Sequence, residues 1–396
     1  MTADPLVSVV VPAFNAGATL RETLASIAAQ TYRELEIIVV DDGSTDDTAE
    51  IAEGYVNADP RFRLLRQANL GVAAARNTGI RASSAAYIAF IDADDLWHPS
   101  KTAKQLALLL ASGGETALVY SPFRQIDAKG MVYGASRNHR VDGWVANRHF
   151  YVNIVGNGSS ILIRKRVLEE IGGFSSLLSE RDAQGSEDML LQLQVALRYR
   201  FATVPEYLVG YRQSLHGLSS REERMLRSTL LSLEIALADS PDLVQFEKSG
   251  MFGRKLWEYL KLMASHGRLG QGLAFVLPYV RGRTGLLAEA VLQDGAHKFK
   301  RLCQVALDLP AGLLRSKPAI NLRHFYDYDP RDPNYADHLP VTQEMERRDA
   351  VYAALLALAP LDAAYNPEKY LTKTDPVRQP PEFPGLRKPR NETITL

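Results

Sequence analysis

The chain has 396 residues, 46% of them hydrophobic, so it can bury at least one large core and cannot be disordered throughout. Lysine plus arginine equals aspartate plus glutamate at 46 each, and this balance gives no overall field that would attract nucleic acid. The single cysteine, Cys303, excludes an intramolecular disulfide and a cysteine-based zinc site, and it favours a reducing, cytoplasmic location. Residues 1–5 do not resemble a signal peptide, and the longest apolar stretch, 273–280, is far shorter than the ~20 residues of a spanning helix, so we expect no membrane crossing.

The first 110 residues alternate two hydrophobic periods, which predicts strands and helices in turn. Strand and helix in repeated alternation imply a parallel sheet, whose ligand crevice lies beyond the carboxyl ends of its strands. Phe14, Asp42 and Asp94 fall at those ends. A capping-box pattern from Thr19 to Glu22 opens the first helix. The predicted strands are 6–11, 35–40, 62–65 and 87–91, and the predicted helices are 20–28, 48–55, 71–82 and 100–110.

Beyond residue 110 the pattern is less regular and then becomes helical. It predicts strands at 117–121 and 159–163, a hairpin turn at 127–130, a helix at 186–197, extended structure at 201–211, and long helices at 221–238 and 252–265. We therefore divide the chain into a sheet-based unit, 1–220, a helical extension, 221–365, and a proline-rich tail, 366–396, that is extended or disordered.

Several short motifs follow one another in order along residues 6–220. They are VSVVV at 7–11 with PAFN at 12–15, QTY at 30–32, VVDDGSTD at 39–46, ARNTG at 75–79, FIDADD at 90–95, IGGF at 171–174 and ED at 187–188. In order and spacing they resemble glycosyltransferase family 2. The resemblance implies an α/β, Rossmann-like GT-A fold with a mostly parallel sheet flanked by helices, here followed by a mainly helical C-terminal extension. It also implies inverting transfer of a sugar from a nucleotide diphosphate donor to an acceptor hydroxyl.

An acidic cluster, Asp92, Asp94 and Asp95, follows the fourth predicted strand. A nucleotide diphosphate carries two charged phosphates that need a cation, and Mg²⁺ or Mn²⁺ prefers carboxylate oxygens. The resemblance implies that Asp94 ligates this metal, whereas Asp92 lies nearer the ribose or a metal-bound water. The alternative is a solvated turn that the aspartates stabilise through their own backbone bonds.

Asp42 ends the second predicted strand, where one carboxylate oxygen can accept the imide N–H of uracil. Cytosine lacks this donor, whereas thymine and guanine have one, so the argument favours a UDP-sugar without fixing the base. The resemblance adds Pro12, Phe14 and Asn15 as the other side of the base and ribose pocket. The alternative for residues 41–46 is helix capping and interaction with the helix dipole.

Residues for catalysis and donor contact lie on two predicted helices. Arg76 and Asn77 are expected to approach the donor, and for Arg76 a structural salt bridge is an equal alternative. Inverting transfer needs one group to remove the acceptor proton, and the resemblance places that base at Asp188. Glu187 is then expected to position neighbouring groups. The alternative is that Ser186 caps the helix and both acids interact with its dipole.

Further candidates surround the acceptor or the diphosphate. Tyr211 and Arg212 followed by His216 are similar to a segment of the family, although His216 lies two residues later than in the usual pattern. His216 either reaches the metal or diphosphate or lies on the surface of a polar loop. Trp97 either walls the sugar pocket or fills the core. Asn157 falls where relatives shape the acceptor side.

The helical extension mixes basic and apolar residues, which fits either peripheral contact with an anionic membrane surface or a solvated helix face packed on the first unit. We also expect a homo-oligomer through this extension, and a saccharide, lipid-linked or protein acceptor, with surface polysaccharide assembly favoured. A catalytically silent binding or scaffold protein is the alternative, against which the intact Asp42, Asp94 and Asp188 argue. PAFN at 12–15 fits neither a nucleotidyltransferase, which needs a glycine-rich loop there, nor an aspartate-dependent phosphatase.

Overall fold

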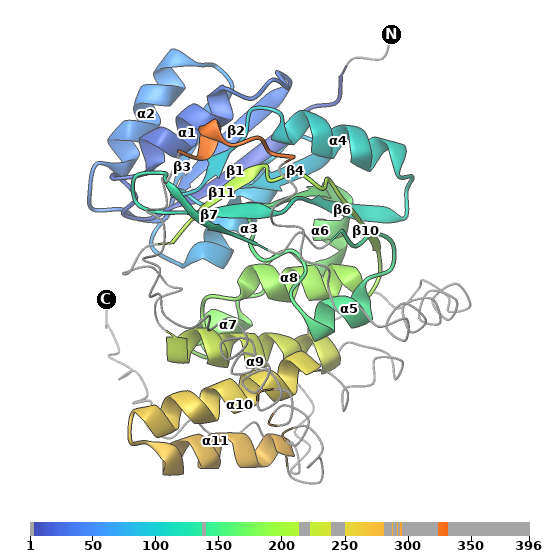
Figure 1. The fold of residues 1–396 in the computed structure, drawn as a ribbon. Helices are drawn as coiled ribbons and strands as arrows, with labels where there is room; N and C mark the ends of the chain where they lie inside the picture. The colour runs from blue at the N-terminus through green and yellow to red at the C-terminus, as the bar shows by residue number, and fades with distance from the viewer. Residues whose placement is uncertain are drawn as a thin grey trace, which may run out of the picture.

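The computed structural model describes residues 4–136, 140–213, 222–238, 250–280 and 324–331, together with residues 287, 291 and 294. In this part of the chain a seven-stranded sheet lies between helices that cover both of its faces (Figure 1). The strand order is β10-β6-β9-β4-β1-β2-β3. The strands are β1 (Val7–Ala13), β2 (Leu35–Asp41), β3 (Phe62–Arg66), β4 (Tyr87–Phe90), β6 (Thr116–Tyr120), β9 (Ile161–Arg164) and β10 (Arg200–Thr203).

Pairing within this sheet is mostly parallel, as the sequence predicted. β1 runs parallel to β2 and β4, β2 to β3, and β10 to β6, whereas β9 is antiparallel to both β4 and β6. The four strands predicted in the first 110 residues correspond to β1 through β4 and differ only at their ends. Runs of valine and isoleucine form the central strands because both faces of such a sheet are buried.

The two faces of the sheet pack against different helices and form two cores. Val9 and Val11 of β1 lie in the core that contains the apolar residues of α1 and α4, whereas Val10 lies in the core shared with α3 and α8. Alternate side chains of a strand point to opposite faces, so one strand supplies both cores. The helices around the sheet are α1 (Leu20–Ala28), α2 (Thr48–Ala58), α3 (Val72–Ala82), α4 (Lys101–Ala111), α6 (Lys165–Ile171) and α8 (Glu187–Ala196).

The capping box predicted at the start of α1 does not form. Thr19 makes no side-chain capping bond, and its Oγ1 instead donates to the carbonyl oxygen of Ala93 at 2.9 Å. Glu22, the expected partner in the box, forms a 2.7 Å ion pair with Arg212. Long-range partners therefore replaced the local capping bonds, and they tie α1 to the loop that follows β4.

A second, smaller sheet with the order β5-β11-β7-β8 was not predicted. The hairpin expected at 127–130 does join β7 to β8. Residues 324–331, which the sequence division assigned to the helical extension, lie against this sheet, where Phe325 packs with Leu96 and Ile126. The elements are β5 (Leu96–Trp97), β7 (Phe123–Ile126), β8 (Val132–Ala135), β11 (Val209–Arg212) and the short 3₁₀ helix η3 (Phe325–Asp327).

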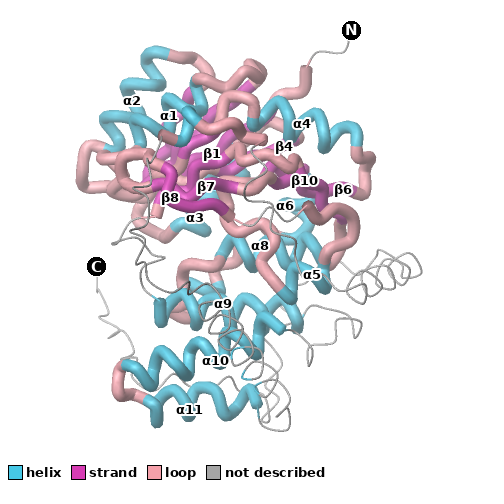
Figure 2. Tube along the Cα trace, in the orientation of Figure 1, coloured by secondary structure: helices cyan, strands magenta, loops and turns pink. Residues whose placement is uncertain are grey.

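Helices stack in layers beyond the large sheet (Figure 2). Apolar residues of α9, α10 and α11 continue the core that begins at the sheet and passes through α8. Two of these three helices were predicted; α11 was not, and neither were the short α5 and α7. None of the described helices is both long and apolar enough to span a bilayer. The bounds are α5 (Ala146–Tyr151), α7 (Leu177–Glu180), α9 (Glu222–Ala238), α10 (Gly250–Ser265) and α11 (Leu269–Val280), and the predicted tail 366–396 lies outside the described residues.

Candidate active site

Three parallel strands end side by side and deliver the predicted site residues to one edge of the large sheet. Ala13 at the end of β1 pairs with Asp41 at the end of β2, and β4 adjoins β1 on its other side. Phe14 and Asn15 follow β1, residues 42–46 follow β2, and residues 92–95 follow β4. Phe14, Asp42 and Asp94 thus lie beyond the carboxyl ends of neighbouring strands, as the sequence predicted.

Asn15 ties the loop after β1 to the loop after β2. Its φ of 48° lies in the left-handed region, which asparagine tolerates better than most residues. The Asn15 side-chain oxygen accepts the N–H of Thr45 at 2.8 Å, and its own N–H donates to Ser44 Oγ at 3.0 Å. Beside it the Phe14 ring is 48% exposed, so this apolar face is open to a ligand, whereas Pro12 is buried.

Asp42 is buried and organises the segment between β3 and α3. Its Oδ1 accepts hydrogen bonds from Gln67 Nε2 at 2.7 Å and from the N–H of Leu70 at 3.0 Å. Its Oδ2 accepts the N–H of Gly71 at 2.8 Å. Gly71 has a φ of 89° and precedes the first residue of α3. Three hydrogen-bond donors of the protein therefore bond to the carboxylate that was predicted to contact the nucleobase.

Arg76 of α3 is a buried cation among the acids. Its Nη2 lies 2.6 Å from Asp92 Oδ1, and its guanidinium lies over the Phe174 ring at 5.0 Å. Desolvation lowers the pKa of Arg76, but the negative charges of Asp92, Asp188 and Glu187 outweigh it and raise the pKa, so the guanidinium stays charged. The structural salt bridge, one of the two interpretations of Arg76, is therefore present.

Asp94 and Asp95 differ although they are adjacent. Burial, and then the charge of Asp92, raises the pKa of Asp94 to about 6, and Asp94 forms no ion pair within the described part of the chain. Asp95 is fully buried, and its carboxylate accepts Ser159 Oγ at 2.5 Å and the N–H of Arg212 at 2.8 Å. Burial, followed by the charges of Asp94 and Asp92, raises the pKa of Asp95 well above its usual range. Asp95 thus supports the loop, and Asp94 remains available to a cation.

Arg212 and Tyr211 of β11 bring a distant segment to the acidic loop. The Arg212 side chain donates to the carbonyl oxygen of Asp94 at 2.6 Å and pairs with Glu22. Burial raises the pKa of Tyr211, and the charges of Asp95, Asp188, Asp92 and Asp94 raise it further. Tyr211 was not chosen as a site residue, although the Tyr-Arg segment of the resemblance was the signal for it.

Asp188 at the start of α8 completes the cluster. Burial raises its pKa to about 6, with the charges of Asp92 and Glu187 adding to the effect and Arg76 opposing it. A Cβ placed on Gly158 would lie 3.3 Å from Arg76 Nη2 and 3.6 Å from Asp188 Cβ, so the base candidate adjoins the Arg76–Asp92 pair. Asp188 Oδ1 accepts the N–H of Met189 at 2.8 Å. The acids from β4 and α8 therefore converge.

Local capping does not explain this part of the chain. Ser186 makes no capping bond, because its hydroxyl pairs with Thr229 Oγ1 at 3.2 Å. Both carboxylate oxygens of the buried Glu187 accept the N–H of Gly185 at 3.0 Å. Glu187 thus fixes the turn before α8.

The structure corrects the contact predicted for Asn77 and decides between the two alternatives for Trp97. Asn77 does not face the donor, because its Oδ1 and Nδ2 both bond to the backbone of Phe174 at 2.8 Å. Trp97 does not wall a sugar pocket, because it is fully buried in the core, where its Nε1 donates to the Ser159 carbonyl at 2.9 Å and Lys101 Nζ lies 3.8 Å from the ring centroid. Both side chains hold other segments in place.

Asn157 lies close to the acids but is buried. Its Oδ1 accepts the N–H of Ser160 at 2.9 Å, and its carbonyl accepts Gln192 Nε2 at 3.2 Å. Its Nδ2 has no hydrogen-bond partner within the described residues. The other acceptor-side candidate, His216, lies outside the described residues.

The residues present fit a hard divalent cation bound together with its substrate. Within the described ranges no group of three or more His, Cys, Asp or Glu is arranged to hold a metal. Magnesium-type sites, however, are often built from one or two carboxylates plus substrate phosphates. Asp94, whose pKa is raised and which forms no ion pair among the described residues, supplies such a carboxylate beside Asp92.

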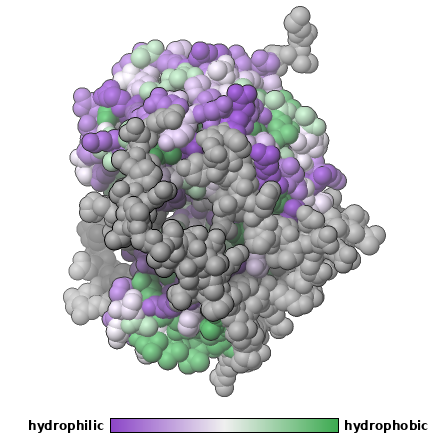
Figure 3. Space-filling model, viewed as in Figure 1, coloured by the Kyte–Doolittle hydropathy of each residue, from purple (hydrophilic) through white to green (hydrophobic). Residues whose placement is uncertain are grey.

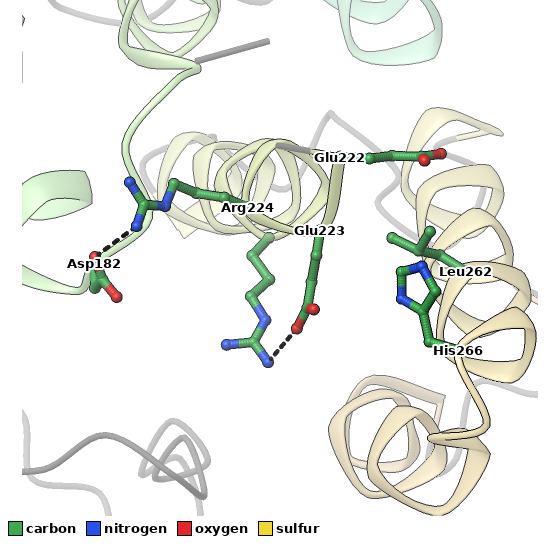
Figure 4. Close-up of a pocket in the computed structure, with 7 residues that line it drawn as sticks. Asp182, Glu222, Glu223, Arg224, Leu262 and His266 are labelled. Atoms are coloured by element: carbon green, nitrogen blue, oxygen red, sulfur yellow. Dashed lines mark ion pairs between the residues drawn. The ribbon is translucent and has the colours of Figure 1, made fainter. Parts of the chain in front are cut away.

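A cavity of ≈ 490 Å³ between α9 and α10 is not this site (Figure 4). Its charged groups are largely paired with one another, as Arg224 is with Asp182 at 3.6 Å and Arg227 with Glu223 at 3.0 Å. The predicted site residues that the structure describes do not line it. Its lining residues are Asp182, Glu222, Glu223, Arg224, Arg227, Leu262 and His266.

Comparison with known proteins assigns the first part of the chain to a class. Residues 8–172 match the family model "Glycosyl transferase family 2". The chain is 45% identical over 100 residues to the "Uncharacterized glycosyltransferase YibD" of Escherichia coli (strain K12), which is 25% of this chain and 29% of YibD. It is 47% identical over 91 residues to the "Uncharacterized glycosyltransferase EpsJ" of Bacillus subtilis (strain 168), which is 23% of this chain and 26% of EpsJ.

The recognition of glycosyltransferase family 2 is confirmed for this segment, although each match spans less than a third of the relative's length. Among solved structures, the mannosyltransferase PcManGT from Pyrobaculum calidifontis aligns with a TM-score of 0.50 and 21% sequence identity. The alignment covers 73% of this chain and 87% of that chain. The fold is therefore the predicted GT-A fold.

Proposed function

We propose that this chain is a metal-dependent, inverting glycosyltransferase that takes its sugar from a nucleotide diphosphate donor. The observation that carries the proposal is the convergence of Asp92 and Asp188 on one buried cation, Arg76, with Asp94 close to Asp92. A site of this kind can bind a diphosphate through a metal and remove a proton at the same place. A core built only for stability would not place Asp92, Asp188 and Glu187 around one arginine, because buried charges are costly.

Asp188 is proposed as the general base. It accepts the proton of the acceptor hydroxyl as that oxygen forms its bond to the anomeric carbon and the bond from this carbon to the diphosphate oxygen breaks. With a pKa of about 6, Asp188 is ionised at neutral pH and is a stronger base than an ordinary aspartate. A single displacement inverts the anomeric centre and requires no enzyme nucleophile.

Asp94 is proposed as the metal ligand, and Asp92 as its neighbour near the ribose. When bound there, Mn²⁺ or Mg²⁺ would neutralise charge on the departing diphosphate. Arg76 keeps the Asp92 carboxylate in a fixed position through the 2.6 Å ion pair. His216 is a second candidate for the metal or the diphosphate.

The nucleotide is proposed to lie between Phe14 and Asp42, with Pro12 and Asn15 shaping the same pocket. A carboxylate has about four acceptor positions, and Asp42 uses three of them within the protein, so one remains for an imide N–H. Uracil provides that donor, which favours a UDP-sugar. Guanine provides one as well, and PcManGT is described in complex with GDP-Man and Mn2+, so GDP-sugars belong in any test.

The acceptor is proposed to be a hydroxyl of a saccharide, a glycolipid or a glycoprotein, in surface polysaccharide or glycoconjugate synthesis on the cytoplasmic side. Asn157 is the candidate on the acceptor side, because it adjoins Gly158, where an added Cβ would lie within 4 Å of both Arg76 and Asp188.

Calorimetric titration of the full chain with nucleotide sugars, with Mn²⁺, Mg²⁺ or a chelator, tests the proposal directly. We expect one UDP-sugar to bind with metal and to lose most of its affinity in the chelator. Product analysis with that donor and candidate acceptors should then show an inverted linkage. Donor binding without turnover on any acceptor would favour the silent binding protein, and no binding of any nucleotide sugar would overturn the proposal.

A further inference from the structure

The outer face of α11 is apolar along its whole length. Leu269, Leu273 and Leu277 follow one another at intervals of four residues and are 48%, 42% and 57% exposed. Residues four apart lie on the same side of a helix, so the three leucines form one stripe. Gly270, Ala274 and Pro278 are exposed beside the stripe, and together these six residues are called the α11 outer face.

The opposite side of α11 is apolar too. Phe275 and Val276 are buried in the core, and Gly272 lies so close to α10 that an added Cβ would be 2.8 Å from Met263 Cβ. Only two of the twelve residues in α11, Gln271 and Tyr279, have a side chain that can form hydrogen bonds, and none is charged. A helix that is apolar all round is normally covered on every side.

The position of this helix makes its exposure informative. α11 is the outermost layer of the helical stack, with α10 between it and α9, and it lies at the far end of the molecule from α1 and α2 (Figure 1). In the space-filling view a hydrophobic area occupies the same end of the molecule (Figure 3). Contiguous apolar patches of this kind mark contacts with proteins or membranes.

The size of the face argues against a second copy of the chain as its main occupant. A stable protein interface involves roughly 20–30 residues on each side. The α11 outer face offers six residues from a single helix, and it has no charged group that would set the register of a partner helix. A bilayer can bind a small apolar face, and it has no partner helix whose register must be set.

The residues that bracket α11 carry positive charge. Arg268 directly precedes the helix and is 40% exposed while it pairs with Glu223, and Arg281 and Arg283 follow the helix in sequence. Residues 250–280 contain four Lys or Arg and one Glu, a difference of +3, and Asp294 and Glu223, which pair with Lys261 and Arg268, offset two of these charges. Interfacial helices combine an apolar face with basic residues at its borders, which meet anionic headgroups.

We propose that the α11 outer face is a docking site for an anionic lipid bilayer. The helix lies in the plane of the interface with its three leucines among the acyl chains, and Arg268 at its start meets the headgroups. Its twelve residues extend about 18 Å, too short to span but sufficient to lie along the surface. This proposal does not depend on the glycosyltransferase reaction.

Flotation of the full-length chain with vesicles tests the site. The wild-type chain should float with vesicles of phosphatidylcholine and phosphatidylglycerol, bind pure phosphatidylcholine more weakly, and lose part of its binding in high salt. The double variant Leu273→Glu/Leu277→Glu should bind the anionic vesicles at least about tenfold more weakly, because two apolar side chains are lost and two negative charges are gained. A matched control is Leu110→Glu on α4, whose leucine is 45% exposed, and it should bind as the wild type does.

Several outcomes would overturn the proposal. Wild-type chain that stays with the soluble fraction, or a double variant that floats as well as the wild type, removes the docking site. A double variant that changes the mass in light scattering without vesicles identifies the face as a contact between copies. A double variant that lowers the melting temperature by many degrees more than Leu110→Glu identifies it as a buried intramolecular face.

Discussion

Two groups of aspartates lie at the same edge of the large sheet, yet the protein treats them differently. After β2, three donors bond to Asp42, and hydrogen bonds from Thr48 and Gly17 outweigh desolvation and lower the pKa of Asp46. After β4 and at the start of α8, burial dominates, and it raises the pKa of both Asp94 and Asp188 to about 6.

The difference separates carboxylates that hold the backbone from carboxylates that are left to react. A carboxylate that accepts several N–H groups is stabilised in its ionised form and is committed to them. A buried carboxylate with fewer donors gains most from a cation or a proton, which are what a metal and an acceptor hydroxyl supply. Substitutions at four residues, taken from the largest expected effect to the smallest, test whether this division holds.

The largest effect is expected for Asp188→Asn. It keeps the shape of the side chain and removes the base, so the rate of transfer should fall by about 10²–10⁴-fold while donor affinity stays nearly unchanged. Steady-state turnover and calorimetry measure the two quantities. Asp182→Asn is the matched control, because Asp182 is an exposed aspartate on another surface, and its φ of 50° suits asparagine. If Asp188→Asn turns over at the wild-type rate, Asp188 is not the general base.

The metal assignment predicts a smaller loss, at the binding step. Asp94→Asn should weaken donor binding in Mn²⁺ by at least about tenfold, because the metal loses a charged ligand. In chelator the variant and the wild type should bind the donor equally. Calorimetry in both buffers gives the comparison, and equal affinities in Mn²⁺ would place the metal elsewhere.

Arg76 should set the pH dependence of the reaction. Asp188 accepts a proton only when it is ionised, so kcat should decline about tenfold for each pH unit below the pKa of about 6. Arg76 holds that pKa down, against burial and the charges of Asp92 and Glu187. Arg76→Met should therefore move the acid limb of the kcat profile to higher pH, and Arg76→Lys should move it less. Circular dichroism checks the fold of both variants. If the acid limb of the kcat profile does not move, Arg76 does not lower the pKa of the catalytic base.

The smallest effect is expected on the nucleotide side, and it concerns stability. Asp42→Asn replaces one acceptor oxygen with a donor that faces other donors, which should lower the free energy of unfolding by about 1–3 kcal/mol. Asp47→Asn, an exposed residue without a side-chain capping bond, should change it by less than about 0.5 kcal/mol. Urea unfolding measures both. Equal free energies of unfolding for Asp42→Asn and Asp47→Asn would mean that Asp42 does not hold the loop before α3.

The sequence located much of the site because its signals are local. Each acid of the proposed machinery follows an apolar run or begins a helix, and the parallel pairing of β1, β2 and β4 was enough to predict that Asp42 and Asp94 lie at the same edge of the sheet. Asp188 was placed by resemblance, and the structure puts it next to Arg76. The second sheet could not be predicted, because β5 has two residues and pairs with β11, more than a hundred residues later.

What the sequence could not decide was the use of each polar group. Asn77, Trp97 and Asp95 all lie in or beside the motifs, yet their polar atoms bond to backbone or side-chain groups far along the chain. Asp95 accepts Ser159, 64 residues away, and the N–H of Arg212, 117 residues away. Such donors leave no local pattern, so sequence alone cannot separate a supporting aspartate from a reactive one.

By itself the sequence determined the alternation of strand and helix, the parallel centre of the sheet and the placing of acids at strand ends. These features depend on hydrophobic period and run length, which act over neighbouring residues. The tertiary structure alone decided which acids are saturated with hydrogen bonds, which share the charge of Arg76, and which face of α11 stays uncovered. The physical reason is that hydrogen bonding, burial and charge depend on distances in space, which the folded chain sets between residues remote in sequence.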